Sequence, residues 1–461
     1  MRYSQLLAKT QRQVPSDIRA VSYRLLLRGG YIRPLAQGLF SLLPLGQRVL
    51  HKLKAIVAAE MERLGGLEVS VPLVNPMGLW RRSGRETLVG EDLAKFTDRS
   101  GRQMVLAPSH EEAMVELIRT SINSYRDFPV FLYQFQTKFR DEPKTKCGLI
   151  RAKEFLMKDA YSFHRSFTEL NNFFPKVFGA YQRIFEQCGL EATPVEAGVG
   201  YMGGDKAFEF VTACDCGDDV MIECGHCGYR ASSDVAVGQP QIPAEPPLEI
   251  ERVSTPGCNT MGRLAEYLGV PRNRLAKPVV YATDSGLVMA VVRADREVSE
   301  EKLIHASGES GVRLATRDEL TAAGLVPGYL SPVDCSDAAL ENILVIIDET
   351  VADTPNLVYG ANEKDYHYRN VNFGRDFDCR HVADIARVLE WDRCVHCGEE
   401  LIERGVMELG HIFRLGDYYS RALELSFRGE RGERVIPHMG AYGIGMGRLM
   451  ASIVEQHHDD Y

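Results

Sequence analysis

The sequence predicts a protein of the α/β (α+β) class, in which a second domain of mixed helices and strands is inserted into the first. Three observations lead to this prediction: residues 131–140 alternate with a period of two, residues 45–64 form an amphipathic helical pattern, and a proline-rich stretch precedes new strand and helix patterns after residue 247. The chain has 461 residues, of which 45% are hydrophobic and 25% are charged. This composition is typical of a globular protein with two or three domains.

A strand with one aromatic face and one polar face is predicted for Phe131–Arg140. Successive side chains of a strand point to opposite faces, so alternate residues belong together. The aromatic face comprises Phe131, Tyr133, Phe135, Thr137 and Phe139, and the polar face comprises Gln134, Gln136, Lys138 and Arg140. The pattern indicates a strand whose aromatic face is buried.

A loop and a second extended run follow this strand. Asp141–Leu149 contains proline and glycine, which indicate a loop, and Lys144 and Lys146 lie at its tip. Ile150–Met157 is extended again, so the two runs predict a hairpin with Arg140 at its lip. An arginine on a rigid strand suits a phosphate oxygen, because its guanidinium binds bidentately and keeps its charge. A surface hairpin with ordinary ion pairs is the alternative.

The order of residues in this hairpin resembles motif 2 of the class II aminoacyl-tRNA synthetases. The matching residues are Phe139, Arg140, Asp141 and Glu142, then a loop, then Arg151, Glu154 and Phe155. The continuation from Phe155 to Phe163 narrows the resemblance to the bacterial type of prolyl-tRNA synthetase. The resemblance implies the antiparallel class II synthetase sheet flanked by helices, with an inserted mixed α/β editing domain.

An amphipathic helix is predicted for Leu45–Leu64, because its apolar residues recur on one stripe and Gly65 and Gly66 follow it. A short alternating run at 67–71 then leads into Pro72, which belongs at a strand end or edge. Helix, strand and proline resemble motif 1, the dimer-forming element of the family, which implies a homodimer through this region. A helix packed on the sheet of its own chain is the alternative, and the pattern fits both.

The start of the next predicted helix carries both a cap and a candidate ligand. Ser109 and Glu112 have the spacing of a capping box, which predicts that they close the helix N-terminus. By resemblance, Glu111 holds the ammonium of proline, and Ser109, where the family usually has threonine, contacts the same amino acid. Gly198–Phe210 indicates a turn and a strand. Glu209 on that strand either lines the proline pocket, as the resemblance implies, or is a solvated strand residue.

The composition changes after Gln239, where a proline-rich stretch up to Pro247 indicates a linker. Beyond it, strands are predicted at Leu287–Val292 and Ile343–Ile347, and helices at Thr260–Leu268 and Asp337–Glu341. We therefore expect a first catalytic part at 1–223, a Cys-x-x-Cys turn (a knuckle) and a linker at 224–247, an inserted editing domain at 248–390, and a second catalytic part at 391–461.

The inserted segment resembles the domain of bacterial prolyl-tRNA synthetases that deacylates mischarged tRNA. The residues that carry the resemblance are Lys277, Asp348, Gly360 and His367. By resemblance, Lys277 engages the phosphates of the acyl-tRNA, and the cavity near His367 accepts alanine but excludes proline. Taken one at a time, Lys277 fits an ordinary surface lysine, and His367 fits a buried histidine whose hydrogen bonds are made within the protein. Their joint order favours editing of alanyl-tRNA(Pro).

Two Cys-x-x-Cys pairs flank the inserted segment, and a glycine follows each pair. Their members are Cys224 and Cys227 on one side and Cys394 and Cys397 on the other. Four thiolates make the tetrahedral ligand set of a structural zinc site, so the spacing predicts Zn²⁺. The alternatives are four free buried thiols, or a vestigial zinc-ribbon fold that no longer holds metal. The Cys-x-Cys pair at 214–216 receives no assignment.

A further strand is predicted for Val406–Phe413. Strict alternation would place Glu408, Gly410 and Ile412 on one face and Met407, Leu409, His411 and Phe413 on the other. By resemblance, this strand returns to the catalytic sheet, where Glu408 binds ATP through Mg²⁺ and His411 borders the substrate pocket. Mg²⁺ is a hard cation that prefers carboxylate and phosphate oxygens.

The glycine-rich run from Gly440 to Arg448 resembles class II motif 3. It does not fit a dinucleotide fingerprint, because no strand–turn–helix context and no ribose-binding acid can be fitted before Tyr461. Glycines along a strand let the backbone approach a flat adenine ring, and by resemblance Arg448 meets the γ-phosphate. Ala441 stands where bacterial members often have cysteine.

The resemblance implies a two-step reaction with ATP, proline and tRNA(Pro). The proline carboxylate attacks the α-phosphate of ATP, and the terminal ribose hydroxyl of the tRNA then takes the prolyl group. The implied catalytic residues are Arg140, Arg448 and Glu111. The implied ATP-binding residues are Arg140, Glu142, Arg151, Phe155, Glu408 and Arg448, and the implied proline-binding residues are Ser109, Glu111, Arg140, Glu209 and His411.

Charge and hydropathy exclude some classes of protein. The formal net charge of −9 argues against non-specific coating of nucleic acid. No apolar run approaches a membrane span, and Met1–Val14 has no apolar signal core, so a cytoplasmic protein without a membrane partner is expected. Eleven cysteines, an odd number with four in Cys-x-x-Cys pairs, favour metal over disulfides.

Members of the family continue beyond the position of Tyr461 into a domain that reads the anticodon, so tRNA charging is expected to be weak if this chain is complete. The rival hypotheses are a non-charging paralogue, a stand-alone editing hydrolase, and another class II specificity such as threonine. The presence of Arg140, Glu111 and Arg448 argues against the first. The insertion between motifs 2 and 3 disfavours the last.

Overall fold

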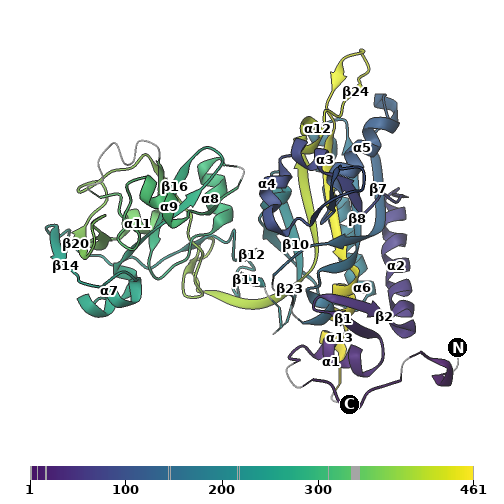
Figure 1. Cartoon of the computed structure of the whole chain (residues 1–461), viewed down its shortest axis with the longest axis horizontal. Coiled ribbons are helices and arrows are strands. Elements are labelled where there is room, and N and C mark those ends of the chain that lie inside the picture. Colours follow the sequence, from purple (N-terminus) through teal and green to yellow (C-terminus); the bar gives the residue numbers. More distant parts are fainter. Residues whose placement is uncertain are drawn as a thin grey trace. The chain divides into compact units, whose positions relative to one another are not determined.

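The computed structural model describes residues 3–7, 9–15, 18–143, 145, 147–214, 216–217, 219–309, 311–333 and 343–459. The chain forms two compact units (Figure 1): unit 1 comprises Met1–Val220 and Gly405–Tyr461, and unit 2 comprises Met221–Arg404. The inserted segment predicted at 248–390 lies within unit 2. Among the described residues, no helix has both the length and the apolar character needed to cross a membrane.

Unit 1 is built on an antiparallel sheet. In spatial order its strands are β9 (Thr193–Ala197), β10 (Lys206–Ala213), β23 (Leu401–Gly416), β26 (His438–Gly445), β8 (Glu154–His164), β7 (Val130–Phe139) and β3 (Leu67–Glu68). The pairing of β3 with β7 is parallel, whereas the other pairings in this series are antiparallel. The predicted hairpin is confirmed as β7 and β8, which pair from Val130 with Phe163 to Phe139 with Glu154.

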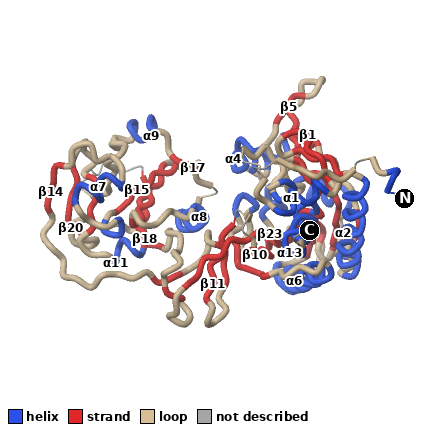
Figure 2. The backbone as a smooth tube through the Cα atoms, turned by 90° about the horizontal axis from the view of Figure 1, so that it is seen from below, coloured by secondary structure: helices blue, strands red, loops and turns tan. Residues whose placement is uncertain are grey.

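Three helices cover the aromatic face of this sheet: α2 (Pro44–Arg63), α6 (Phe167–Gln187) and α13 (Met446–His457) (Figure 2). Phe131 and Tyr133 of β7 join their buried core, as the alternation predicted. The helix predicted at 45–64 is confirmed as α2. It begins at Pro44, whose fixed φ and missing N–H suit the first turn of a helix.

The opposite face of the sheet packs against α5 (Glu111–Ser121) and α12 (Tyr418–Ala422). Unit 1 has further α-helices and strands, which are α1 (Val21–Arg28), β1 (Ile32–Ala36), β2 (Leu39–Leu42), β4 (Val74–Pro76), α3 (Met77–Arg82), α4 (Arg85–Val89), β5 (Lys95–Thr97), β6 (Gln103–Leu106), β24 (Phe427–Arg428) and β25 (Arg434–Val435). Strands β1 and β2 form a hairpin, and β4, β6 and β5 form a small sheet.

Unit 2 contains a five-stranded sheet and a three-stranded sheet. The first has the order β17 (Arg313–Leu314), β15 (Ala276–Ala282), β16 (Leu287–Arg293), β18 (Ile343–Asp348), β21 (His381–Ala383), and the second has the order β14 (Glu251–Ser254), β20 (Tyr366–Val371), β19 (Leu357–Gly360). The helices are α7 (Met261–Leu268), α8 (Glu300–Ser307), α9 (Arg317–Ala322) and α11 (Glu349–Asp353). Short strands β12 (Arg230–Ser232), β13 (Gly238–Gln239) and β22 (Arg393–Cys394) complete the unit, and β11 (Asp219–Cys224) leads into it.

Both strands predicted inside the inserted segment are confirmed, as β16 and β18. The helix predicted at Thr260–Leu268 is also confirmed, because Thr260 caps α7 by accepting a hydrogen bond from the backbone N–H of Arg263. The helix predicted at Asp337–Glu341 lies outside the described residues.

Two local predictions in unit 1 are wrong. Ile150–Met157 is not one extended run, because residues 148–150 form a 3₁₀ turn and β8 begins only at Glu154. Two residues with positive φ, Cys147 at 56° and Gly148 at 67°, bend the chain at the start of this turn.

The capping box of Ser109 and Glu112 is also wrong. Helix α5 begins at Glu111 after His110, and no side chain caps it. The two predicted capping side chains instead contact a buried arginine of α4, described below, because a buried guanidinium without hydrogen-bond acceptors is costly.

Candidate active site

A row of polar and glycine residues crosses the sheet of unit 1, one from each of five neighbouring strands. The row is Gln134 on β7, Asp159 on β8, Gly443 on β26, His411 on β23 and Glu209 on β10. Residues that lie directly opposite each other on paired strands share a face of the sheet. The five positions therefore form one polar line, which we call the polar row.

An apolar row lies two residues further along each strand. Its members are Leu132, Tyr161, Ala441, Phe413 and Ala207, and all are buried. The polar row and the apolar row share one face, because a step of two residues returns a strand to the same side.

Gly443 keeps the middle of the polar row open. A Cβ at this position would meet Met157 Sδ at 3.4 Å and, among the described atoms, no closer neighbour. The backbone of β26 is thus exposed to a ligand at this point, as expected where a flat ring must approach the chain closely.

The alternation predicted for Val406–Phe413 is wrong at one residue. The pairing of β23 with β10 slips at Leu409, which forms a β-bulge with no partner of its own on β10. Glu408 and His411 were expected on opposite faces, but the bulge brings them together, with Glu408 Oε1 3.7 Å from His411 Nδ1. Period-two reasoning cannot detect an inserted residue, since it assumes an unbroken strand.

Arg448 lies in the first turn of α13, next to this bulge. Its guanidinium forms an ion pair with the Glu408 carboxylate, and its Nε donates to the carbonyl of Ile150 at 2.9 Å. The second contact ties α13 to the loop of the β7–β8 hairpin. Arg448 is therefore held between the glycine-rich strand and that loop.

Arg140 follows β7 directly and approaches the same corner. Its Nε donates to the carbonyl of Pro108 at 3.3 Å, and its guanidinium lies 5.3 Å from the centre of the Phe155 ring. The charges of Arg140 and Arg448 both act on Glu408 and on His411. The structure thus brings together two arginines that are far apart in the sequence.

The electrostatics of this corner fix the protonation of two groups. Burial raises the pKa of Glu408, but Arg448 and His411 lower it more, so the net shift is downward and the carboxylate is ionised. Burial lowers the pKa of His411 to about 4, and the two arginines act in the same direction. His411 is therefore neutral at neutral pH. Among the described atoms its buried Nε2 has no hydrogen-bond partner, which leaves it available to a ligand.

Arg85 is the site residue that sequence reasoning missed. Its side chain is completely buried, and its Nη1 lies 2.9 Å from Glu111 Oε2 and 3.1 Å from Glu112 Oε2. Its Nη2 donates to Ser109 Oγ at 2.7 Å. Its segment, Ser83–Val89, contains no charge periodicity that would have marked it as a buried residue.

The Arg85 cluster contains two carboxylates and one guanidinium. Burial raises the pKa of Glu112, and the charge of Arg85 opposes that rise. When both carboxylates are ionised, Glu111 and Glu112 outnumber the single guanidinium by one charge. A buried excess of one negative charge suits a ligand ammonium group.

Two residues on the polar face of β7, Gln134 and Lys138, are buried rather than solvated. Lys138 is fully buried, with its Nζ 2.9 Å from Asp159 Oδ1 and in contact with His110 Nδ1. Gln134 and Tyr161 donate to Asp159 Oδ2 at 2.9 and 2.8 Å. Burial and the nearby Lys138 charge lower the pKa of His110 to about 3, so this histidine is neutral and accepts from Lys138. The network holds Asp159 rigidly within the polar row.

Glu142 and Arg151 face each other across the hairpin loop and form an ion pair. Both are partly exposed, which leaves them accessible to a ligand from solvent. Lys144 and Lys146, predicted at the loop tip, lie outside the described residues.

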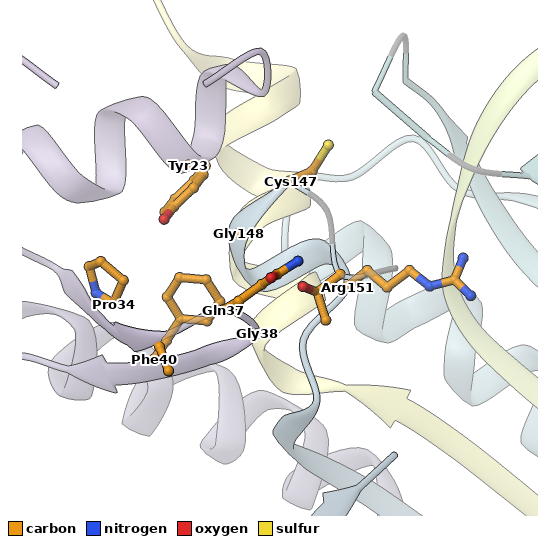
Figure 3. Close-up of a pocket in the computed structure, with 10 residues that line it drawn as sticks. Tyr23, Pro34, Gln37, Gly38, Phe40, Cys147, Gly148 and Arg151 are labelled. Atoms are coloured by element: carbon orange, nitrogen blue, oxygen red, sulfur yellow. The ribbon is translucent and has the colours of Figure 1, made fainter. Parts of the chain in front are cut away.

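A pocket of about 300 Å³ lies between this loop, α1 and the β1–β2 hairpin (Figure 3). Tyr23, Phe40 and Pro34 form its aromatic and apolar side, whereas the guanidinium of Arg151 points away from it. Arg151 therefore belongs to two surfaces, with its stem lining the pocket and its charge directed to Glu142.

The four predicted metal ligands of unit 2 converge. The Sγ atoms of Cys224, Cys227, Cys394 and Cys397 all lie within 4.8 Å of one another. The 224–397 and 227–394 sulfur pairs are separated by 3.4 and 3.6 Å. Zn–S bonds of about 2.3 Å in a tetrahedron place sulfurs roughly 3.8 Å apart, so this donor set fits zinc closely.

The two knuckles, Cys224–Cys227 and Cys394–Cys397, have the same backbone conformation at the glycine that follows each of them. Gly228 and Gly398 both have left-handed φ values, of 78° and 77°. Their N–H groups donate to the carbonyls of Cys224 and Cys394 at 3.1 and 2.8 Å. A turn closed in this way directs both cysteines of each pair to the same side.

The residues expected to edit mischarged tRNA lie on two sheets of unit 2. Gly360 and His367 face each other on β19 and β20, and His367 Nδ1 is 2.6 Å from Thr255 Oγ1. Burial lowers the pKa of His367 to about 4, so it is neutral. Lys277 on β15 contacts Glu297 at 2.8 Å and is partly exposed.

Asp348 is buried and committed to the backbone. It accepts from the N–H groups of Thr350, Ile385 and Ala386 at 2.8–2.9 Å, which uses both of its oxygens. Three backbone donors on one carboxylate are typical of a group that fixes local structure.

Comparison with known proteins identifies the family. The model of the tRNA synthetase class II core domain (G, H, P, S and T) matches residues 94–457. A proline--tRNA ligase of Dehalococcoides mccartyi is 41% identical over 461 residues, which cover 100% of this chain and 80% of the relative. One of Moorella thermoacetica is 41% identical over 463 residues with the same coverage. The chain belongs to the proline--tRNA ligase family.

The fold agrees with that of other members. A prolyl-tRNA synthetase from Cryptosporidium parvum, solved with halofuginone and AMPPNP, matches the chain with a TM-score of 0.50 at 10% identity. The match covers 95% of this chain and 53% of that one. Both the predicted proline--tRNA ligase family and the predicted class II fold are therefore confirmed.

Proposed function

We propose that the polar row and the arginines beside it form the site at which this proline--tRNA ligase joins proline to ATP. The observation that supports this most is the approach of Arg140 and Arg448 to one corner, where both act on Glu408. Arg448 is paired with Glu408, whereas Arg140 forms no ion pair with a carboxylate among the described residues. A polyphosphate supplies the negative charge that this corner lacks.

In the proposed first step, a carboxylate oxygen of proline attacks the α-phosphorus of ATP. A new P–O bond forms as the bond to pyrophosphate breaks, which gives prolyl-adenylate. Arg140 stabilises the charge that develops on the α-phosphate, and Arg448 holds the γ-phosphate. The proposed roles of Glu142, Arg151 and Phe155 are to orient the nucleotide, since the reaction depends on positioning and charge stabilisation.

Glu408 is the residue proposed to hold Mg²⁺. Its carboxylate is ionised and partly accessible, and it pairs with Arg448. Carboxylate and phosphate oxygens are the ligands that Mg²⁺ prefers, and the ion would neutralise charge on the phosphates.

Proline is proposed to lie between the Arg85 cluster and the apolar row. Glu111, which also contacts Arg85, would receive the ammonium, and Ser109 would contact the same end of the amino acid. Glu209 and His411, which lie 3.5 Å apart at the end of the polar row, would line the pocket. Arg140 would bind the carboxylate as it approaches the α-phosphate.

In the proposed second step, the terminal ribose hydroxyl of tRNA(Pro) takes the prolyl group and AMP leaves. Unit 2 is proposed to hydrolyse mischarged alanyl-tRNA(Pro). The partly exposed Lys277 would bind tRNA phosphate, and His367 and Gly360 would border the alanine site. Asp348 would support the site through its backbone contacts rather than touch the substrate.

Three further assignments belong to this proposal. The four-cysteine set of unit 2 would hold a structural Zn²⁺, which would fix the two knuckles to each other. A homodimer would form through the motif 1 region, where the exposed Leu67 on the edge strand β3 supports contact with a second copy. The enzyme would act in the cytoplasm.

Proline-dependent exchange of pyrophosphate into ATP tests the adenylation site. Arg140→Ala removes a contact that we expect to strengthen in the transition state, so exchange should fall about a hundredfold or more. Arg126→Ala is the matched control, because Arg126 is exposed and contacts only the ring and hydroxyl of Tyr125 among the described side chains.

Both variants should keep the circular dichroism spectrum and the unfolding midpoint of the parent. If Arg140→Ala folds normally and retains exchange within a few-fold of the parent, Arg140 does not stabilise the transition state. Exchange that requires an amino acid other than proline would contradict the substrate assignment.

A further inference from the structure

Unit 1 contains a pair of thiols that the proposed reaction does not use. Cys214 and Cys216, the Cys-x-Cys pair without an assignment from the sequence, follow β10, and their Sγ atoms lie 2.7 Å apart. This separation is too short for two thiolates on one zinc ion, which would lie roughly 3.8 Å apart. An S–S bond is about 2.05 Å long, so the two sulfurs lie within about 1 Å of bonding distance. The geometry therefore favours thiol–disulfide chemistry over metal binding.

Backbone contacts on both sides of the pair hold it against the sheet. The N–H of Gly217 donates to the carbonyl of Cys214 at 3.1 Å, and the N–H of Cys214 donates to the carbonyl of Gly405 at 3.3 Å. A Cβ on Gly217 would lie 2.0 Å from the carbonyl oxygen of Val406, so only glycine lets the chain approach β23 this closely. The fold thus keeps the thiols close together, which lowers the conformational entropy lost when they join.

The two thiols differ in acidity. Hydrogen bonds from the Cys216 thiol and from the backbone N–H groups of Cys216 and Gly217 lower the pKa of Cys214, although burial opposes them. The contact with Cys214 and burial both raise the pKa of Cys216. Because the thiolate is the nucleophile in disulfide exchange, Cys214 is suited to attack and Cys216 to resolve the intermediate. Both side chains are partly exposed, so a small oxidant can reach them.

A nearby carboxylate disfavours the thiolate form of both cysteines. An oxygen of Glu455, on α13, lies within 4.8 Å of both Sγ atoms. Its negative charge acts to raise the pKa of each thiol. A disulfide carries no charge, so its formation removes the repulsion between the carboxylate and a thiolate. Glu455 therefore favours the disulfide over the thiolate.

The pair adjoins the loop of the β7–β8 hairpin. Cys147, in that loop, donates from its Sγ to the carbonyl of Cys216 at 3.6 Å. The turn that follows Cys147 includes Ile150, whose carbonyl accepts from Arg448 Nε at 2.9 Å. A shift of the Cys216 backbone would therefore act on the loop that holds Arg448.

We propose that Cys214 and Cys216 are a reversible redox pair whose oxidation lowers adenylation in unit 1. The Cys214 thiolate attacks a low-molecular-weight disulfide such as oxidised glutathione, which forms a mixed disulfide and releases one small thiolate. Cys216 then loses its proton, and its sulfur attacks Cys214 Sγ, which forms the intramolecular disulfide and releases the second small thiolate. Two cysteine thiols are oxidised to one disulfide, and the small disulfide is reduced to two thiols.

Reversible disulfides of this kind are the usual ones in reducing compartments, where they are catalytic or sense redox state. The formation of the disulfide is independent of the proposed adenylation, because it is measured without turnover. Its effect on the reaction rests on the proposed function, through the contact between Cys216 and the hairpin loop.

Oxidised glutathione, followed by alkylation of free thiols and peptide mass analysis, tests the chemistry in the full chain prepared with zinc. The parent should form a disulfide between Cys214 and Cys216 that a reductant reverses. Cys216→Ser should accumulate a mixed disulfide of glutathione on Cys214, and Cys214→Ser should form such an adduct at least tenfold more slowly. Cys379→Ser, which alters a thiol bonded to the carbonyl of Val345, is the matched control and should oxidise as the parent does.

Proline-dependent exchange of pyrophosphate measures the effect on the candidate active site. Exchange by the oxidised parent should fall at least threefold and recover with reductant, whereas Cys214→Ser/Cys216→Ser should keep the rate of the reduced parent under both conditions. A folded parent in which both thiols stay free under oxidised glutathione, or in which one pairs with Cys147, would overturn the redox pair. Equal exchange by the oxidised and reduced parent would overturn its effect on adenylation.

Discussion

At the residue scale, buried charges determine what the side chains near the site do. Ser109 and Glu112 have the sequence of a helix cap, yet both contact Arg85, and α5 begins without them. A buried guanidinium without acceptors is more costly than a helix end without a side-chain cap. The Arg85 cluster is therefore a structural support for the proposed proline pocket.

Arg85→Ala should destabilise the protein strongly. It leaves Glu111 and Glu112 buried without a counter-charge, and breaking such a pair typically costs about 3–5 kcal/mol. Arg82→Ala is the control, because its contact with Glu424 is 3.7 Å long and exposed, and it should change the free energy of unfolding by less than about 0.5 kcal/mol. Urea unfolding measures both.

A second change distinguishes lost charge from lost packing. Glu112→Gln in the Arg85→Ala background removes one of the two uncompensated charges and should recover part of the lost stability. If Arg85→Ala unfolds within 1 kcal/mol of the parent, or if the second change gives no recovery, the charge explanation of this cluster is wrong.

Lys158 predicts a pH dependence of stability. It is buried on β8, its Nζ donates to Tyr181 Oη at 2.6 Å, and burial lowers its pKa to about 7. Because the pKa in the unfolded chain is near 10.4, the unfolded state binds more protons between about pH 7 and 10. Stability should therefore rise with pH across this window as the cost of the buried charge disappears.

Lys158→Met removes this titration while it keeps the length of the side chain. The free energy of unfolding of the parent, measured relative to Lys158→Met, should increase from pH 7 to pH 9. Lys176→Met, which replaces an exposed lysine of α6, should show a difference that does not change with pH. A pH-independent difference for Lys158→Met would mean that the lysine binds its proton equally in the folded and unfolded states, so that burial does not lower its pKa.

At the element scale, irregular points of the strands create the site. The bulge at Leu409 turns Glu408 and His411 toward each other, and Gly443 leaves the backbone of β26 open between Asp159 and His411. Regular strands would have put Glu408 on the far face and a side chain over the middle of the row. Bulges often have this role, because they re-aim a side chain without ending the strand.

Gly443→Ala should therefore affect ATP binding more than stability. Among the described residues the new Cβ meets only Met157, at 3.4 Å from Sδ and 3.8 Å from Cε, so the strand should tolerate it. It would intrude on the proposed adenine surface at a cost of about 1–3 kcal/mol, which corresponds to a rise of roughly fivefold or more in the KM for ATP. Pyrophosphate exchange as a function of ATP concentration measures the effect.

Gly78→Ala on α3 is the control, because a Cβ there meets no described atom within 4 Å, and it should leave the KM unchanged. An unchanged KM for ATP in a stable Gly443→Ala protein would show that adenine does not lie over this part of β26.

At the scale of the whole molecule, synthesis and editing are assigned to different units. The proposed adenylation site lies in unit 1, whereas Lys277, Gly360 and His367 all lie in unit 2. Each unit has its own buried hydrophobic clusters. Variants of one unit should therefore change one activity and leave the other in place.

Lys277→Ala tests this division. It should reduce hydrolysis of alanyl-tRNA(Pro) by at least tenfold, because it removes a cation proposed to bind phosphate, and it should leave proline-dependent exchange unchanged. Arg317→Ala, on an exposed position of α9, is the control within the same unit and should affect neither activity. Hydrolysis at the rate of the parent in Lys277→Ala would contradict the proposed role.

Periodicity and residue order were enough to predict much of this protein. The hairpin of β7 and β8, the helix α2 and the strands β16 and β18 follow from local patterns, because side-chain alternation reflects which face is buried. The family also follows from motif order, since those residues are read along the chain. The convergence of the four knuckle cysteines agrees with their spacing.

Only the tertiary structure decided which side chains meet. Arg85, the bulge at Leu409 and the group formed by Cys214, Cys216 and Glu455 leave no periodic signal, because each depends on contacts between segments distant in the sequence. Local patterns report whether a residue is buried, but a buried charge or thiol takes its role from the partner that the fold brings to it.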